Sequence, residues 1–359
     1  MDPTELTALG LYDPTVADAA ERLALLDFLV DLGASADQLV AYRDFLPWLA
    51  AVLSIRGVPA LSVEEVAAQA QLSAAEVRRL VRLAGLPDPE PGARVLTEGF
   101  VALARGMAGV TAVFGEDAGY QLLRVLGAAM ARVADAVGSA FAVNVGPAAL
   151  RDGAGLGLAK ANVEAARLLP FVPAALDTLF RQQLLVSPRI VNSDADQVGF
   201  DTQPLVVGFA DLVGSTQLGE QLSAGQLGAT ISAFENVATD AVRAGGGRVI
   251  KLTGDGILFT APDAPAAVAI GLDLSAKFRA HPLVPPIRVG LAAGQVLLRD
   301  GDVFGHVVNL AARVVTVGGP GDVIVTAEVA AASGAPAEAC GPHQLKGIAG
   351  EVNLFRLVP

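Results

Sequence analysis

Residues 206–216 read VVGFADLVGST, an apolar run that ends at Asp211 and passes through Gly214, Ser215 and Thr216 into a helical pattern. The run predicts a buried strand whose end places a carboxylate where a hard cation can bind. Backbone N–H groups at the start of the following helix can hold phosphate oxygens. The stretch is not a P-loop, because the GxxxxGK[ST] spacing and its lysine are absent. Taken alone, it also fits an Asp and a Ser/Thr pair that simply cap a helix.

A second stretch, RVIKLTGDGILF at residues 248–259, sets two apolar strands around a Thr-Gly-Asp-Gly turn and predicts a hairpin. Asp255 alone would be a turn residue. Lys251, however, interrupts an apolar strand and is one of only four lysines in the chain. Four strand residues separate Lys251 from Asp255 by about 13 Å, which is too far for a simple ion pair. The two side chains could therefore serve two ends of a long ligand or two different sites.

A third stretch, DVFGHVVNLAARV at residues 302–314, becomes helical from Val307. Asn309 and Arg313 then lie at positions i and i+4 on one helix face. An arginine beside an asparagine suits polyphosphate and ribose oxygens. The alternative is an exposed polar stripe on an amphipathic helix.

The two halves of the chain differ in pattern. Residues 1–186 are rich in Ala and Leu at helical spacing and predict an all-α domain. Two stripes illustrate this spacing: Ala19, Leu23, Leu26 and Val30, and Leu122, Leu126, Met130 and Val133. Residues 187–204, SPRIVNSDADQVGFDTQP, predict a connector. From residue 205 onward short apolar runs alternate with helical segments, which indicates an α+β domain at 205–359.

Composition excludes several classes of protein. The 359 residues carry a net charge of −12 and are 53% hydrophobic, which argues against disorder and against sequence-independent binding of nucleic acid. The longest uncharged stretch of the first half, residues 136–150, is shorter than the about 18–20 residues that a spanning helix needs. The N-terminus does not have the pattern of a signal peptide. One cysteine, Cys340, permits no intrachain disulfide. We therefore expect a cytoplasmic protein without a membrane span.

Together the three stretches resemble the class III nucleotidyl cyclase catalytic domain. The resemblance covers residues 205–357, including LKGI at 345–348 and NLFRL at 353–357. Six positions carry it at the family's spacing: Asp211, Lys251, Asp255, Asp302, Asn309 and Arg313. It implies a ferredoxin-like βαββαβ core and an enzyme that makes a 3′,5′-cyclic nucleotide and pyrophosphate.

The resemblance also implies roles for the polar residues. Asp211 and Asp255 match the carboxylates that hold two Mg²⁺ or Mn²⁺ ions, and oxygen ligands suit these cations. Arg313 would stabilise charge on the α-phosphate, and Asn309 would position the ribose. The Gly214–Thr216 turn would contact phosphate.

Base choice follows from hydrogen-bond polarity. Lys251 can donate to N1 of adenine and Asp302 can accept from its N6 amine, whereas guanine reverses both groups. The predicted substrate is therefore ATP. Family domains pair head to tail and share each site between two chains, so we expect a homodimer.

The N-terminal half contains a possible DNA-binding motif. Residues 61–100 resemble a helix-turn-helix of the mercury-resistance regulator type, with helices at 63–70 and 74–84 and Ser73 as the second N-cap. Neighbouring acidic residues offset its arginines, so we do not expect it to bind DNA. Residues 1–186 loosely resemble the helical regulatory domain of some actinobacterial cyclases, which implies regulation through a small-molecule or lipid effector. The alternative for the whole chain is a catalytically silent cyclase-like module that binds nucleotide or dimerises.

Overall fold

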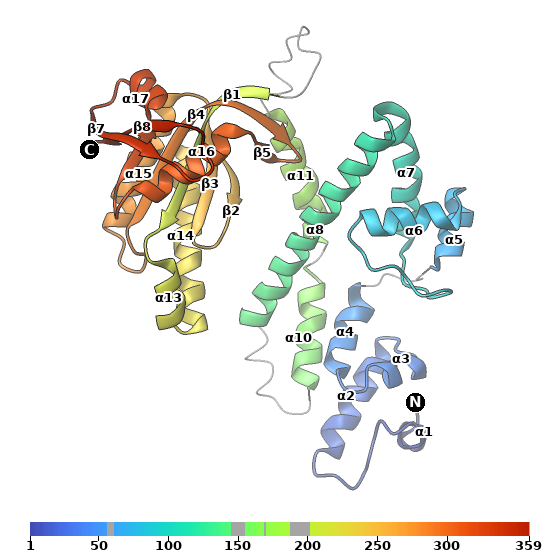
Figure 1. The fold of residues 1–359 in the computed structure, drawn as a ribbon. Helices are drawn as coiled ribbons and strands as arrows, with labels where there is room; N and C mark the ends of the chain where they lie inside the picture. Colours follow the sequence, from blue (N-terminus) through green and yellow to red (C-terminus); the bar gives the residue numbers. More distant parts are fainter. Residues whose placement is uncertain (56–60, 145–154, 169, 187–201, 359) are drawn as a thin grey trace. The chain divides into compact units, whose positions relative to one another are not determined.

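The computed structural model describes residues 1–55, 61–144, 155–168, 170–186 and 202–358. The chain divides into two compact units, Met1–Asp194 and Ala195–Pro359. This division falls within the connector predicted at 187–204, most of which lies outside the described residues. Each unit is described by itself below (Figure 1).

All regular elements described in the first unit are helices, apart from one isolated bridge between Leu61 and Leu96. They are α1 (Pro3–Ala8), α2 (Ala19–Asp31), α3 (Ala36–Ala41), α4 (Leu46–Ile55), α5 (Val63–Ala70), α6 (Ala74–Leu83), α7 (Glu98–Phe114), α8 (Glu116–Asn144), α10 (Leu156–Ala166) and α11 (Phe171–Leu185). The all-α prediction for this half is confirmed for the part of the chain that the structure describes.

Two separate hydrophobic clusters stabilise these helices. Helices α1–α4 pack around Leu25, Leu29 and Leu49, and α10 adds Ala159 to this cluster. Helices α5–α8 form the second cluster around Val66 and neighbouring apolar side chains. Burial of this apolar surface, rather than helix propensity, supplies most of the stability of such short helices.

The helix-turn-helix prediction is accurate to one residue. Helix α5 covers 63–70 as predicted, and α6 ends at Leu83 rather than at residue 84. Ser73 accepts a hydrogen bond from the backbone of Glu76 and forms a capping box, so it is the predicted N-cap. Gln71 makes the turn between the helices with a left-handed φ of 59°.

One predicted apolar stripe is helical but not buried. Leu122, Leu126 and Met130 lie on α8 at the expected spacing, yet each is at least 40% exposed. Leu123 is the buried side chain of this region and joins the α5–α8 cluster. The helical period was therefore predicted correctly, and α8 packs on α6 and α7 through the side that carries Leu123.

The second unit is a mixed sheet flanked by helices. Its elements are β1 (Thr202–Leu212), α13 (Ser215–Gln221), α14 (Ala224–Ala244), β2 (Arg248–Leu252), β3 (Gly256–Ala261), α15 (Ala264–Arg279), β4 (Ile287–Arg299), β5 (Asp302–Phe304), α16 (His306–Val314), the 3₁₀ turn η2 (Val315–Val317), β6 (Val323–Thr326), α17 (Ala327–Ser333), β7 (Ala337–Gln344) and β8 (Glu351–Leu357). Strand β1 thus begins three residues before the predicted start of the α+β domain at 205.

Strand order confirms the predicted ferredoxin-like core. The sheet runs β2-β3-β1-β4-β6-β8-β7, with β5 paired to β4. Its first half, β1-α14-β2-β3-α15-β4, is therefore a βαββαβ unit with additions at the C-terminal side. Helices α14 and α15 cover one face through Phe234 and Phe278. Helix α16 covers the other face through Val307 and Ala311 (Figure 1).

Strand β1 is buried on both faces. Val206 and Ala210 point into the cluster under α14 and α15, while Val207 joins the cluster under α16. Because successive side chains of a strand point to opposite faces, a strand between two helical layers needs a continuous apolar run. This requirement explains the run that the sequence shows at residues 205–210.

Glycine at position 290 fixes the distance between the sheet and α16. A Cβ there would lie 2.3 Å from the backbone nitrogen of Val315, directly after α16. We expect Gly290→Ala to displace the end of this helix and lower the free energy of unfolding by about 1–3 kcal/mol. Urea unfolding followed by circular dichroism measures this difference.

Gly228→Ala is the matched control. Gly228 lies inside α14, and a Cβ there would have no atom within 4 Å. Alanine at this helical position should raise the free energy of unfolding by up to about 1 kcal/mol. Equal unfolding midpoints for Gly290→Ala and the wild type would contradict the proposed close contact.

Candidate active site

Two carboxylates lie at one end of the sheet. Asp211 is the penultimate residue of β1, and its register partner on β3 is Gly256. The backbone N–H of Leu212 donates to the carbonyl of Asp255 at 2.8 Å, which ties the β2–β3 turn to the end of β1. Asp255 is exposed and Asp211 is partly buried, and both belong to segments that meet at this end of the sheet.

Gly256 is closely packed beside the end of β1. A Cβ at this position would lie 3.1 Å from the Ala210 carbonyl and 3.7 Å from Asp211 Oδ1. The glycine therefore allows the turn to approach β1 closely. Carboxylates on two such adjoining segments are of the ligand type that a Mg²⁺ or Mn²⁺ ion prefers, with water or phosphate oxygens completing the coordination. No group of three acidic, His or Cys side chains suited to a metal occurs among the residues that the structure describes.

Arg288 is a site residue that the sequence reasoning missed. It lies on β4 directly opposite Asp211 and donates to Asp211 Oδ2 from Nη2 at 2.7 Å and from Nε at 3.3 Å. The signal was present, since Arg288 interrupts an apolar strand as Lys251 does. Only the strand register, however, reveals that its partner is Asp211.

Lys251 and Asp302 meet although they are 51 residues apart. Lys251 Nζ lies 2.6 Å from Asp302 Oδ2, which joins β2 to β5. Asp302 Oδ1 accepts a second hydrogen bond, from the Val303 N–H at 2.9 Å. Burial alone would raise the pKa of Asp302, but the hydrogen bonds from Lys251 and Val303 outweigh it and hold this pKa below its usual value. Asp302 is therefore ionised at neutral pH and can accept further hydrogen bonds.

Asn309 and Arg313 share the exposed face of α16, as their spacing predicts. Val307, Ala311 and Val314 bury the opposite face. Within the described residues, no hydrogen bond or ion pair joins either polar side chain to Asp211 or Asp255. The structure thus pairs Asp211 with Arg288 beside the turn that carries Asp255, and pairs Lys251 with Asp302. It leaves Asn309 and Arg313 facing solvent.

The predicted phosphate turn leads into a short helix. Gly214 adopts a left-handed φ of 79° before α13, which begins at Ser215. No side chain caps this helix, so the alternative explanation of a Ser/Thr cap does not hold here. The side chain of Thr216 lies outside the described residues.

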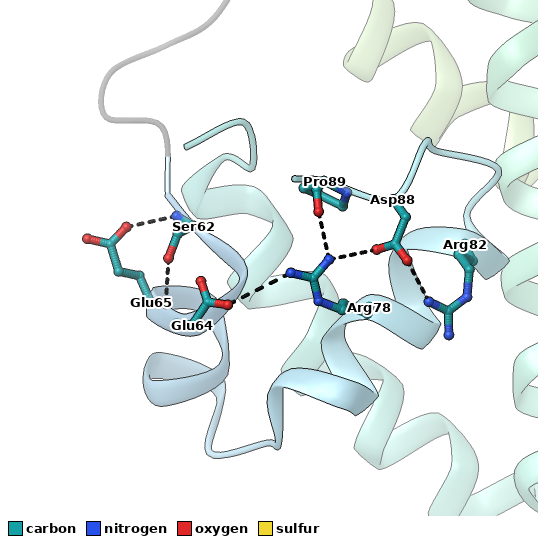
Figure 2. Close-up of polar contacts among 7 residues, drawn as sticks. All are labelled: Ser62, Glu64, Glu65, Arg78, Arg82, Asp88 and Pro89. Carbon is teal, nitrogen blue, oxygen red and sulfur yellow. Dashed lines mark hydrogen bonds and ion pairs between the residues drawn. The ribbon is translucent and has the colours of Figure 1, made fainter. Parts of the chain in front are cut away.

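The arginines of the helix-turn-helix are engaged within the N-terminal unit. Arg78 Nη1 donates to Asp88 at 3.0 Å and to the Pro89 carbonyl at 2.7 Å. Arg82 Nη1 donates to Asp88 at 2.9 Å, and Figure 2 draws these contacts. Arg79 lies over the ring of Tyr120. The hydrogen bond from Arg78 lowers the pKa of Asp88 and keeps this carboxylate charged. Pairing of this kind reduces the positive charge that a phosphate backbone would need.

No described helix is long and apolar enough to cross a membrane.

Comparison with known proteins gives matches over both units, although no family model matches the chain. An uncharacterized protein of Mycobacterium tuberculosis is 34% identical over 99% of this chain and 94% of its own length. A pH-sensitive adenylate cyclase of the same species is 31% identical over 94% of this chain and 88% of its own length. The crystal structure of an adenylyl cyclase from P. aeruginosa, 23% identical, covers 45% of this chain and 97% of that one with a TM-score of 0.41.

Proposed function

The chain belongs to the class III adenylate cyclase family, and from that membership we propose that it converts ATP to 3′,5′-cyclic AMP and pyrophosphate. The cyclase reaction itself follows from the family. The choice of ATP is the finer step, and the observation that carries it is the contact between Lys251 and Asp302 at 2.6 Å.

Lys251 and Asp302 can bind each other and form hydrogen bonds to a base at the same time. A lysine ammonium has three donors, and only one is needed for Asp302. An ionised carboxylate accepts several hydrogen bonds, so Asp302 retains capacity beyond Lys251 and the Val303 N–H. A donor beside an acceptor matches N1 and N6 of adenine. Guanine would instead place its N1–H donor against the Lys251 donor and its O6 acceptor against the Asp302 acceptor, which costs about 1–3 kcal/mol for each unsatisfied buried group.

For the chemical step we propose that Asp211 and Asp255 hold two Mg²⁺ or Mn²⁺ ions. When bound, these ions would supply acidification of the ribose 3′-hydroxyl and neutralise the triphosphate. The hydrogen bond that ties the Asp255 turn to the end of β1 and the oxygen-only ligands support this assignment. Arg313 would donate to the α-phosphate and Asn309 would orient the ribose, each through a side chain that is already exposed.

We further propose that a homodimer shares each site between two chains. The support is geometric: Asn309 and Arg313 face solvent on α16, while the acidic pair lies at the end of β1 and β3. One chain then contributes the metal ligands, and its partner contributes the base-reading and phosphate-binding side chains. Each chain would then carry two separate half-sets of site residues: the metal ligands for one site, and the base-reading and phosphate-binding side chains for the other.

We also propose that the helical unit regulates the cyclase unit. The support is that the pH-sensitive adenylate cyclase matches 94% of this chain, which includes the helical unit. A small-molecule or lipid effector would act on this unit.

Base choice provides a test. We expect Lys251→Glu combined with Asp302→Cys to lower kcat/KM for ATP by about 10–100-fold, because both hydrogen bonds to adenine are lost. Steady-state assays with ATP and GTP measure the change. The control is Lys277→Glu with Asp273→Cys, which makes the same replacements in another Lys–Asp pair, on α15. Unchanged ATP kinetics in the first variant would mean that these residues do not read the base.

The shared site provides a second test. Asp211→Ala and Arg313→Ala remove opposite half-sets, so each variant alone should be nearly inactive. In a heterodimer of the two, one site carries both lesions and the other carries neither. With random pairing, co-expressed variants should recover about a quarter of wild-type activity. Verified heterodimers with no gain over the single variants would exclude a shared site and favour a catalytically silent or single-chain module.

Regulation provides a third test. Removal of residues 1–200 should change turnover several-fold at matched dimer concentration. Assays across pH and with added lipid compare the truncated and full-length proteins. Identical kinetics under all these conditions would mean that the helical unit does not regulate the cyclase unit.

A further inference from the structure

An ion pair holds the principal metal ligand of the proposed site. Arg288 and Asp211 face each other across β1 and β4, and their side chains are only 27% and 29% exposed. The guanidinium directs both Nη2 and Nε at the same oxygen, Oδ2. Because the two residues are register partners, the sheet itself brings them together.

The two oxygens of Asp211 are therefore not equivalent. Oδ1 lies on the side of Gly256 and the acidic turn, whereas Oδ2 is taken by Arg288. A divalent cation binds best where carboxylates carry uncompensated negative charge and free oxygens. A guanidinium 2.7 Å away neutralises this charge and occupies one of the oxygens.

We propose that Arg288 competes with the divalent cation for Asp211 and so keeps the metal affinity of the nucleotide-free enzyme low. This inference rests on the proposed metal site of Asp211 and Asp255. Tight ion binding then requires that Arg288 leaves Oδ2. An anionic substrate arriving with the ion offers the guanidinium another partner, so Arg288 links metal binding to substrate binding.

Calorimetric titration of the full-length, nucleotide-free protein with Mn²⁺ tests this competition. Arg288→Met removes the charge and the donors while it keeps the length of the side chain, and should bind Mn²⁺ about tenfold more tightly than the wild type. Arg288→Lys keeps the positive charge but not the contact through two nitrogens. Its Mn²⁺ affinity should lie between those of the wild type and Arg288→Met. Lys277→Met, which removes a paired cation on α15, is the control and should bind as the wild type does.

The opposite role gives the opposite result. If Arg288 orients Asp211 for the ion, Arg288→Met binds Mn²⁺ more weakly, and equal affinity would mean that the pair is irrelevant to the metal. Weaker or equal Mn²⁺ affinity, measured on a variant that thermal unfolding shows to be folded, would contradict the proposal that Arg288 competes with the ion. If Arg288→Met does not fold, Arg288→Lys provides the test. A Mn²⁺ affinity of Arg288→Lys no higher than that of the wild type would also contradict the proposed competition.

Two further variants separate this inference from the proposed function. Asp211→Ala and Asp255→Ala should each abolish the Mn²⁺ titration signal. If they bind Mn²⁺ as the wild type does, or if neither the wild type nor Arg288→Met binds it, the metal assignment fails and the competition fails with it. If they lose binding and Arg288→Met is no tighter than the wild type, only the competition fails.

Discussion

The pairing of β1 with β3 on one side and β4 on the other is the constraint on which the candidate site depends. It places Asp211 opposite Gly256 and also opposite Arg288. Both faces of β1 are buried, so a slip by one residue would exchange the faces of Val206 and Val207 and carry Asp211 to the face under α14 and α15. The apolar run of β1 thus fixes the register, and the register fixes the partners of the acidic side chain at its end.

Opposite charges are matched at both ends of the site. Arg288 neutralises Asp211 near the acidic turn, and Lys251 neutralises Asp302 between β2 and β5. Partly buried charges need such partners, since an isolated one would pay for its lost hydration. The same pairing leaves hydrogen-bonding capacity for a ligand, because lysine and carboxylate groups each form several bonds. The site is therefore both stable without a ligand and able to exchange partners when one binds.

The helix-turn-helix of the N-terminal unit has the predicted shape, and its arginines have partners within the same unit. Its helices follow from two capping boxes and a buried apolar face. Its arginines, however, contact Asp88, the Pro89 carbonyl and the ring of Tyr120 within the same unit (Figure 2). A motif that matches in geometry can thus lack the free positive charge that contact with DNA requires.

The sequence by itself determined the helices at 63–70 and 74–84 to within one residue, the hairpin at 248–259 and the family, because capping, alternation and motif spacing are local signals. It also singled out Lys251 and Asp302 as a functional pair. Only the tertiary structure decided that Arg288 binds Asp211 and that the stripe of Leu122 on α8 stays exposed. Strand register and the choice of a buried helix face depend on contacts between segments far apart in the chain, and no local pattern carries that information.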